Sequence, residues 1–333
     1  MAALPPKQRP GRPRLSPKPP PLPIGGVAAA PRDADKLVEL ELDATKDFKR
    51  VFGMFKAMDA PEIQLVFDPT GVSLYAMPYS AQALRSRDTL ARGTRIFVRI
   101  DGARANHYFC GAPVVQCAIS RTKFDRVFAA PNANTHCVKL HMLRGEPELL
   151  FVTYVNAVLD RLCEYSLTLT QFDDELVGAL AGDAALVFDE AALVARYPFE
   201  WQLEGSDFKQ MVVENVNFAA TVDVMKAGDG PLTLKYRIAN GHDYCETYAT
   251  AAKIKLRVAP GAARLFHVSL NLQQLVPLAS SACMLRVRLL HAPDRPTVFC
   301  SLPPAKKGGR DVTSAAAFRV AVVAEDGWPA APV

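Results

Sequence analysis

Short runs of hydrophobic residues that alternate with polar ones begin at Lys36 and continue almost to the C-terminus. The run "KLVELELD" has the period of two that is typical of a strand, and "TKDFKRVFGMFKAM" repeats its apolar residues with a helical period. "EIQLVF", the turn "DPTG" and "VSLYAM" then predict a β-hairpin. Further strands are predicted at "TRIFVRI" and "VVQCAIS", and a short helix, "RTKFDRVFA", precedes three strands, "HCVKLHML", "ELLFVTYV" and "CEYSLTLTQF".

The same order of elements recurs in the second half of the chain. "FEWQLEG" is followed by a helical "SDFKQMVVENV", several strands, the short helical "NLQQLVPLA" and three final strands. Because many strands accompany only two short helices in each half, the pattern predicts an α+β fold whose helices cover one face of each sheet. We expect five segments: a tail at 1–35, a first domain at 36–172, a connector at 173–198, a second domain at 199–326 and a C-terminal tail at 327–333.

The predicted helix at 46–58 has one apolar and one basic face. At 100° per residue Phe48, Val51, Phe52, Phe55 and Met58 share one arc. The opposite arc carries Lys46, Lys49, Arg50 and Lys56, with Gly53 among them. A solvated face is the ordinary explanation for charges on a helix, but a solubility surface usually mixes both signs. The short helix repeats this pattern, with Phe124, Val127 and Phe128 inward and Lys123 and Arg126 on another side. Aligned bases of this kind suit contacts to phosphates.

The positive charge of the chain lies in its N-terminal tail. The formal net charge is +5, but residues 1–32 hold six basic residues and no acidic one, so the remainder sums to −1. Ten of the 26 prolines lie in residues 1–35, and this composition predicts disorder. Seven cysteines, spread singly and without a secretory signal, indicate a reducing interior, and the apolar runs are too short to span a membrane. We therefore expect an intracellular protein that is neither secreted nor membrane-embedded.

Several of these stretches resemble the DNA sliding clamps of the proliferating cell nuclear antigen (PCNA) type. The resemblance covers roughly residues 36–326 and is closer still to the PCNA-like proteins of African swine fever virus and related large DNA viruses. The stretches that carry it are these: "PGRP" near the start, "FKRVFGMFKAM" (48–58), "FDPTGVSLYAMPYSAQAL" (67–84), "IDGARANHYFC" (100–110), "SRTKFDRVF" (120–128), "EYSLTLTQFDD" (164–174) and "YPFEWQLEGSDFKQMV" (197–212).

The resemblance implies a ring, usually of three subunits, that closes edge to edge around duplex DNA. Such a ring would carry a DNA polymerase and other clamp-binding proteins for replication and repair, in the host nucleus or in a cytoplasmic viral factory. The strand around Tyr165 to Thr170 should meet the strand near Glu246 to Ala252 of the next subunit. The resemblance implies neither a cofactor nor a small-molecule substrate.

The resemblance also assigns candidate residues to each surface. The residues expected to face DNA are Lys46, Lys49, Arg50, Lys56, Arg121, Lys123, Arg126 and Lys209. The residues expected at the subunit interface are Tyr165, Leu167, Leu169 and Tyr248. The residues expected to line the partner pocket are Met77, Leu84, Leu186, Val187, Val322 and Val323, although apolar residues in strands belong to the core more often than not.

The second domain departs from the clamp pattern. Its first helix offers Gln210, Val213 and Asn217 outward, and Lys209 lies slightly off that arc. "NLQQLVPLA" contains no basic residue, and Pro277 should end or kink this helix. We therefore expect the first domain to dominate the attraction to DNA and the second to supply a neutral half of the lining.

The stretch "RPGRPR" in the tail resembles an AT-hook, a Gly-Arg-Pro core that lies in a narrow minor groove. Arg9, Arg12 and Arg14 are therefore candidates to bind DNA, whereas nuclear targeting explains such a tail equally well. On a clamp, the tail would act as an accessory arm at high effective concentration.

Enzyme motifs are absent from the sequence. There is no phosphate-binding loop, no dinucleotide fingerprint and no nucleophile elbow. In "HCVKLH", His136 points to the opposite face of a strand from Cys137 and His141, which is poor zinc geometry, so we expect no metal. Two alternatives to the ring stay open: a clamp relative that binds DNA as a monomer or dimer, as herpesvirus processivity factors do, and a β-rich structural protein of a virion.

Overall fold

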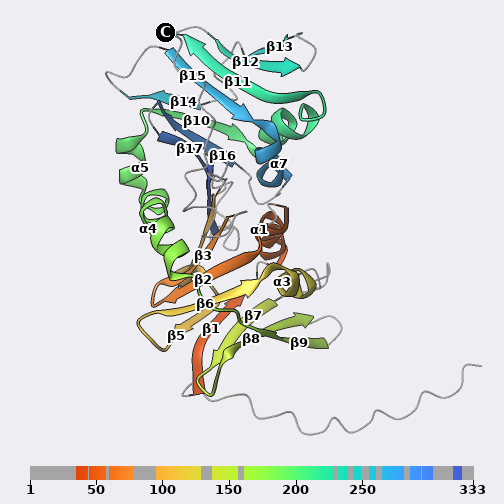
Figure 1. Ribbon diagram of the computed structural model, residues 1–333, viewed down its shortest axis with the longest axis vertical. Coiled ribbons are helices and arrows are strands. Elements are labelled where there is room, and N and C mark those ends of the chain that lie inside the picture. Colours follow the sequence, from red (N-terminus) through yellow and green to blue (C-terminus); the bar gives the residue numbers. More distant parts are fainter. Residues whose placement is uncertain are drawn as a thin grey trace, which may run out of the picture. The chain divides into compact units, whose positions relative to one another are not determined.

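Figure 1 shows the computed structural model of the chain, which describes residues between Asp35 and Ala324 with gaps. The described residues are 35–43, 45–57, 60–77, 95–128, 137–156, 161–227, 231–238, 243–248, 255–259, 265–280, 286–293, 295–302 and 318–324.

The first half contains nine strands, two α-helices and a 3-10 turn in its described residues. They are β1 (Lys36–Leu42), α1 (Thr45–Ala57), β2 (Glu62–Asp68), β3 (Gly71–Ala76), β4 (Arg95–Asp101), the 3-10 turn (Gly102–Arg104), β5 (His107–Cys110), β6 (Val115–Ser120), α3 (Arg121–Phe128), β7 (Cys137–Leu143), β8 (Glu146–Asn156) and β9 (Arg161–Thr168). The order agrees with the sequence pattern, which identified both helices and eight of these strands, whereas β5 and the 3-10 turn were not predicted.

A helical connector leads to a second half with the same plan. The elements of both are α4 (Asp174–Phe188), α5 (Glu190–Arg196), β10 (Phe199–Glu204), α6 (Gly205–Lys209), a π-helical turn (Gln210–Glu214), β11 (Ala219–Ala227), β12 (Leu232–Ile238), β13 (Asp243–Tyr248), β14 (Lys255–Val258), β15 (Leu265–Asn271), α7 (Leu272–Ser280), β16 (Arg286–Ala292), β17 (Arg295–Leu302) and β18 (Phe318–Ala324).

The described strands form three antiparallel sheets, and the strand order of the first half recurs in the second. The five-stranded order β5-β1-β7-β8-β9 recurs as β14-β10-β16-β17-β18, and the four-stranded order β4-β3-β2-β6 recurs as β13-β12-β11-β15. A bulge in the β7–β8 pairing between His141 and Leu143 has a counterpart in the β16–β17 pairing between Leu290 and Ala292. The duplication read from the sequence therefore extends to the register of the strands.

The β18–β4 joint unites the two halves of the described chain. β18, the last strand of the second half, pairs antiparallel with β4 of the first half, with Val320 opposite Val98 and Val322 opposite Ile96. This pairing merges five strands of one half with four of the other into a nine-stranded sheet. The equivalent strands of the other two groups, β9 and β13, stand at the ends of their own sheets.

Buried glutamates occupy equivalent places in the first strand of each half. Glu39 lies opposite His141 in β7, and Glu200 lies opposite Leu290 in β16. Both side chains are buried, and basic residues neutralise them: Lys36 Nζ lies 2.6 Å from Glu39, and Arg257 lies 2.8 Å from Glu200. Burial opposes ionisation of Glu39, but hydrogen bonds from Lys139 and Lys36 outweigh it and lower its pKa.

The connector packs on the sheet through one face of α4. The three acidic residues of "DDE" lie at the N-terminus of α4. Asp173 caps the helix by accepting a hydrogen bond from Leu176 N at 2.8 Å. The next two acidic residues lie in the first turn, where the positive end of the helix dipole stabilises their negative charge. Leu176, Leu180, Ala184 and Val187 form its apolar stripe. This stripe belongs to a hydrophobic cluster with the following sheet residues: Met77, Phe97, Leu290, Val298 and Cys300.

Three arginines of the nine-stranded sheet hold the connector in place. Arg288 donates to both carboxylate oxygens of Glu190, at 2.6 Å for one of them, and this contact lowers the pKa of Glu190. Arg95 forms an ion pair with Asp183. Arg319 donates to the carbonyl of Phe188 at 3.2 Å, and its guanidinium lies 5.4 Å from the centroid of the Phe188 ring.

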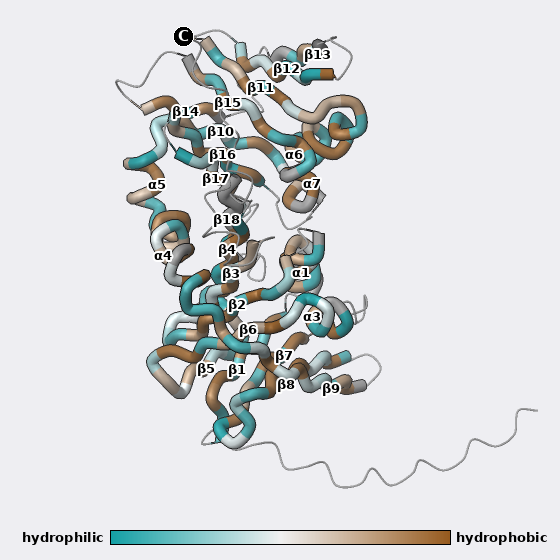
Figure 2. Tube along the Cα trace, in the orientation of Figure 1, coloured by the Kyte–Doolittle hydropathy of each residue, from teal (hydrophilic) through white to brown (hydrophobic). Residues whose placement is uncertain are grey.

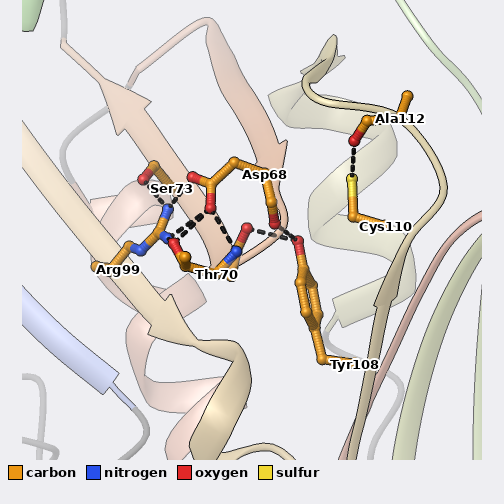
Figure 3. A network of polar contacts seen from close by, with 8 residues as sticks. Asp68, Thr70, Ser73, Arg99, Tyr108, Cys110 and Ala112 are labelled. Atoms are coloured by element: carbon orange, nitrogen blue, oxygen red, sulfur yellow. Dashed lines mark hydrogen bonds and ion pairs between the residues drawn. The ribbon is translucent and has the colours of Figure 1, made fainter.

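A polar network locks the β2–β3 hairpin (Figure 3). Arg99 Nη1 and Nη2 donate to the two oxygens of Asp68 at 2.7 and 2.9 Å, and Nη1 also donates to Ser73 at 2.8 Å. The Tyr108 hydroxyl lies 2.5 Å from the carbonyl oxygen of Asp68 and 2.6 Å from that of Gly71. Gly71 has a φ of 152°, and a Cβ there would lie 2.1 Å from the carbonyl oxygen of Ile100, so the turn requires glycine.

Candidate nucleic-acid interface

The helix α1 presents basic residues on the face opposite its core contacts. Phe48, Val51, Phe52, Met54 and Phe55 are buried. Lys49, Gly53 and Lys56 are exposed, as the helical period predicts. Lys46 and Arg50 lie in the same helix, and their side chains, like the whole of Met58, lie outside the described part of the chain. A helix with this division holds its bases away from the core.

Aromatic packing places α3 beside α1. The ring centroids of Phe52 and Phe124 are 4.5 Å apart, and those of Phe48 and Phe52 are 4.2 Å apart. Phe124 and Val127 are buried, as expected, whereas the side chain of Phe128 is outside the described part. The two helices therefore form one layer over the sheets, and α1 also contacts α7 of the second half.

The bases of α3 lie in the same layer. Lys123 and Arg126 are exposed, and Arg121 is half-buried. Lys123 also donates a hydrogen bond to the carbonyl of Thr168 at 3.2 Å. Together with α1, the first half thus concentrates cationic side chains on two neighbouring helices, an arrangement that suits phosphates and carries no base specificity.

The second half has the same helices with most of the bases replaced. α3 directly follows β6, and α7 directly follows β15, so Arg121 corresponds to Leu272, Lys123 to Gln274 and Arg126 to Pro277. Figure 2 shows hydrophilic positions on α3 and hydrophobic ones on α7. α7 runs on to Ser280, so Pro277 does not end this helix, and a kink at Pro277 stays a prediction. A proline removes one N–H, and the neighbouring hydrophobic residues Leu275 and Leu278 remain buried.

The α6 helix retains one base. The shared "DFK" aligns Lys46 with Ser206, Lys49 with Lys209 and Arg50 with Gln210. Lys209 and Gln210 are exposed, as is Asn217, while Val213 packs partly against the core. After Lys209 the helix widens into the π-helical turn, where buried Asn215 donates to the carbonyl of Met211 at 3.0 Å. The second half is therefore less basic than the first because uncharged residues replace bases at equivalent helix positions.

The predicted interface strands are both edge strands. In β9, Leu167 is buried and Tyr165 is half-buried, so these side chains face the core of their own half. Leu169, just beyond β9, packs partly against the same core. Tyr248 lies in β13, and its side chain is outside the described part, as are residues 249–252. A neighbouring subunit could therefore contact the backbone edge of each strand and the exposed residues beside it.

The predicted partner pocket is largely filled by the chain itself. Met77 and Val187 are 2% and 6% exposed, and both belong to the cluster beneath α4. Leu186 packs partly against that cluster. In this conformation a partner could reach Leu186 but not Met77 or Val187. Leu84 lies outside the described residues, as do the side chains of Val322 and Val323, whose backbone is in β18.

Other candidate chemistry is limited within the described residues. The tail with Arg9, Arg12 and Arg14, and also His136, lies outside them. Within the described ranges, no three or more His, Cys, Asp or Glu side chains gather where a metal ion could bind. The helices in the described ranges all lack a long apolar stretch that could cross a membrane.

Two features of these surfaces were not predicted from the sequence. Leu162, Phe218 and Tyr244 are 64%, 41% and 45% exposed, and two of them lie on the edge strands β9 and β13. The alternation in "DYCETY" could have indicated Tyr244. The second feature is the set of arginines that holds the connector, which no local pattern marks because their partners are more than 80 residues away.

Comparisons with known proteins agree with this architecture. The chain is 24% identical over 285 residues to uncharacterised proteins of African swine fever virus from a pig isolate in Kenya and a warthog isolate in Namibia, covering 85% of this chain and 89% of each relative. The crystal structure of the proliferating cellular nuclear antigen of Entamoeba histolytica superposes with a TM-score of 0.62 at 12% identity, over 87% of this chain and 98% of that one. No family model matches the sequence. The fold is therefore that of PCNA, and the viral proteins are distant relatives.

Proposed function

We propose that this chain is a DNA sliding clamp, a ring that encircles duplex DNA and tethers a polymerase and other replication and repair proteins. The proposal goes beyond the PCNA-like fold, because the viral relatives are uncharacterised. It assigns no catalysis to the chain, which acts by closing around DNA and holding partners near it.

The observation that carries the proposal is the β18–β4 joint. Inside the chain, the last strand of one half pairs with the fourth strand of the other. The strands in the same two positions, β9 and β13, end their sheets with backbone groups that face outward. Because the two halves share one plan, β9 of one chain can join β13 of the next in the same manner. Such a head-to-tail contact closes into a ring when its rotation permits.

The basic layer supports the position of DNA. The bases of α1 and α3 lie on the side of these helices away from the core, and α7 joins the same layer. Positive charge of this kind attracts the duplex without reading its sequence, as a sliding protein requires. The first half supplies most of this attraction, and the second supplies a nearly neutral surface with Lys209.

Three subunits per ring is our working number, taken from the resemblance to clamps. Three chains of 36.3 kDa give a mass of about 109 kDa, three times the chain mass. The mass in solution therefore separates the ring from the alternatives, a monomeric or dimeric DNA-binding factor. A virion structural protein should lack DNA affinity once residues 1–35 are removed.

A threading experiment tests the function directly. A linear duplex with a biotin at each end is incubated with the protein, streptavidin then blocks both ends, and the complex is washed at high salt. A ring stays on the blocked duplex and leaves it after the duplex is cut internally. When streptavidin is added before the protein, a ring that threads over free ends should not be retained, whereas a ring that opens between subunits should be. Retention that persists after the internal cut, or no retention in either order of addition, contradicts a ring that encircles DNA.

A further inference from the structure

We propose that the subunits of this ring join in one specific register, in which Tyr165 of β9 lies opposite Tyr244 of the next subunit's β13. This inference rests on the proposed function, since it needs a second copy of the chain at the same edges. The inference specifies which residues of β9 and β13 lie opposite each other. It also predicts an aromatic contact between the subunits that the β18–β4 joint within the chain lacks.

The equivalence of β9 and β18 follows from the strand pairings. Leu140 lies opposite Leu40 in β1 and opposite Val152 in β8, and Leu289 lies opposite Trp201 in β10 and opposite Phe299 in β17. Val152 and Phe299 are thus equivalent. Val152 faces Tyr165 and Phe299 faces Val322, so Tyr165 occupies the position of Val322.

The equivalence of β13 and β4 follows in the same way. The three successive buried residues at 63–65 in β2 correspond to those at 222–224 in β11. Leu65 lies opposite Leu74, and Val224 lies opposite Leu234, so Ala76 and Tyr236, two residues further along, are equivalent. Ala76 faces Ile96 and Tyr236 faces Tyr244. Tyr244 therefore occupies the position of Ile96.

The joint within the chain then gives the register between chains. Val322 lies opposite Ile96, so its counterpart Tyr165 falls opposite Tyr244 of the neighbour. Ala321 lies opposite Phe97, which places Glu164 opposite Cys245. The flanking pairs follow from the same ladder: Ser166 with Asp243, Cys163 with Glu246 and Leu162 with Thr247.

The surroundings of both tyrosines fit this pairing. Tyr165 packs edge-on against Tyr154 with centroids 6.0 Å apart, and it is half-buried. Tyr244 lies 5.7 Å from the Tyr236 ring and 6.4 Å from the Phe218 ring, and remains 45% exposed. Bringing the two tyrosines together would join these groups into one aromatic array across the subunit boundary. Aromatic cross-strand pairs stabilise sheets, whereas the corresponding pair inside the chain is aliphatic.

A native cysteine permits a sharp test. Cys245 is exposed, and residues directly opposite each other in an antiparallel pair have Cα atoms about 4.5–5.5 Å apart, within the range of a disulfide. Full-length E164C should therefore form a disulfide with Cys245 of the neighbouring subunit under mild oxidation. A closed ring of three would yield a covalent trimer on a denaturing gel, and reductant would dissolve it.

Matched variants define the register. E164C/C245S removes the acceptor thiol, and L162C and S166C place the new thiol two residues away on the same face, at a diagonal distance that is too long for efficient bridging. We expect cross-linking in E164C alone. The separate variant Y244A should weaken assembly about tenfold, because it removes the 45% exposed ring that would pack against Tyr165 of the neighbour.

The outcomes separate this inference from the proposed function. Trimers in solution together with cross-linking by L162C or S166C instead of E164C would overturn the register and leave the ring intact. A protein that stays monomeric at all concentrations would overturn both. Trimers that Y244A does not weaken would overturn the aromatic contact, and cross-linking by E164C with weakened assembly of Y244A supports the whole inference.

Discussion

Lys123 donates a hydrogen bond to the backbone carbonyl of Thr168, with its Nζ 3.2 Å from the oxygen. The lysine lies on α3 among the bases of the first half, and the threonine is the last residue of the edge strand β9. The candidate nucleic-acid face and the candidate subunit joint therefore touch at one point. A phosphate bound by Lys123 would compete with that carbonyl for the same ammonium group.

Removing the charge of Lys123 should weaken DNA binding without changing the mass of the assembly. Each phosphate contact that is lost lowers the slope of log affinity against log salt by about 0.9. K123A should therefore bind more weakly at low salt and show a smaller slope in a fluorescence titration. R196A is the control, because Arg196 is exposed on the connector helix α5. Equal losses in both variants would argue against a specific basic layer.

Adding bases to the second half should strengthen binding. Q210R and Q274K restore the residue types found at Arg50 and Lys123 in the first half, and Gln210 is exposed. We expect higher affinity and a steeper salt slope, with the same titration as the measurement. E146Q on β8, which raises net charge by a similar amount away from the helices, should change neither. Unchanged binding by Q210R and Q274K would mean that the helices of the second half do not approach DNA.

Truncating the apolar stripe of α4 should destabilise the fold. Leu180 is 1% exposed in the cluster beneath the connector, and a fully buried Leu→Ala change costs about 2–5 kcal/mol of the free energy of unfolding. L186A at a half-buried position of the same helix should cost less. Urea denaturation measures both. A loss from L180A no larger than that from L186A would show that α4 is not docked on the sheet in solution.

The Asp68–Arg99 contact should make stability depend on pH in acid. Burial opposes ionisation of Asp68, but hydrogen bonds from Arg99 and Thr70 outweigh it and lower its pKa from 3.8 to about 2. Because the pKa is lower in the fold than in the unfolded chain, the stabilisation is complete above pH 3.8 and is lost as pH falls towards 2. D68N should flatten the pH dependence of the unfolding free energy in this window.

A matched variant isolates the carboxylate of Asp68. S73A removes another partner of Arg99, whose Nη1 lies 2.8 Å from the Ser73 hydroxyl, but it keeps the carboxylate. We expect S73A to lower stability by a constant amount while its pH dependence stays that of the unchanged protein. If S73A and D68N had the same pH profile, the acid sensitivity would come from another group.

Deleting residues 1–35 should leave the oligomer intact and weaken DNA binding at low salt. The deleted segment contains Arg9, Arg12 and Arg14, whose charges would act near the ring at high effective concentration. Analytical ultracentrifugation and a DNA titration measure the two properties separately. Unchanged DNA binding would make the segment a leader or a targeting signal.

The fold could be predicted from the sequence because its signals are local. Alternating runs such as "KLVELELD" become β1, the amphipathic arc of Phe48 and Phe52 becomes the buried face of α1, and the repeated order of elements reveals the duplication. The helical structure of the connector could not be predicted in the same way. Its Ala- and Gly-rich composition is ambiguous, and its position depends on distant residues such as Arg95 and Arg288.

The candidate site could be predicted only in part. Exposure of Lys49 and Lys123 follows from helical periodicity, which needs no tertiary information. The side of the sheet on which Leu167 lies does not follow from a local pattern. Strand alternation allows two faces, and the packing of the sheet determines that Leu167 is buried in the core. The burial of Met77 and Val187 also depends on tertiary packing, because both residues lie in the cluster beneath α4.

The β18–β4 joint has a mechanical consequence for any ring that this chain forms. Three subunits create six joints of one topology, and in three of them the strands belong to the same polypeptide and part only if the nine-stranded sheet unfolds. The other three part by simple dissociation. The lifetime of a closed ring is therefore set by the rate at which β9 separates from β13, and DNA without a free end must enter at a boundary between subunits.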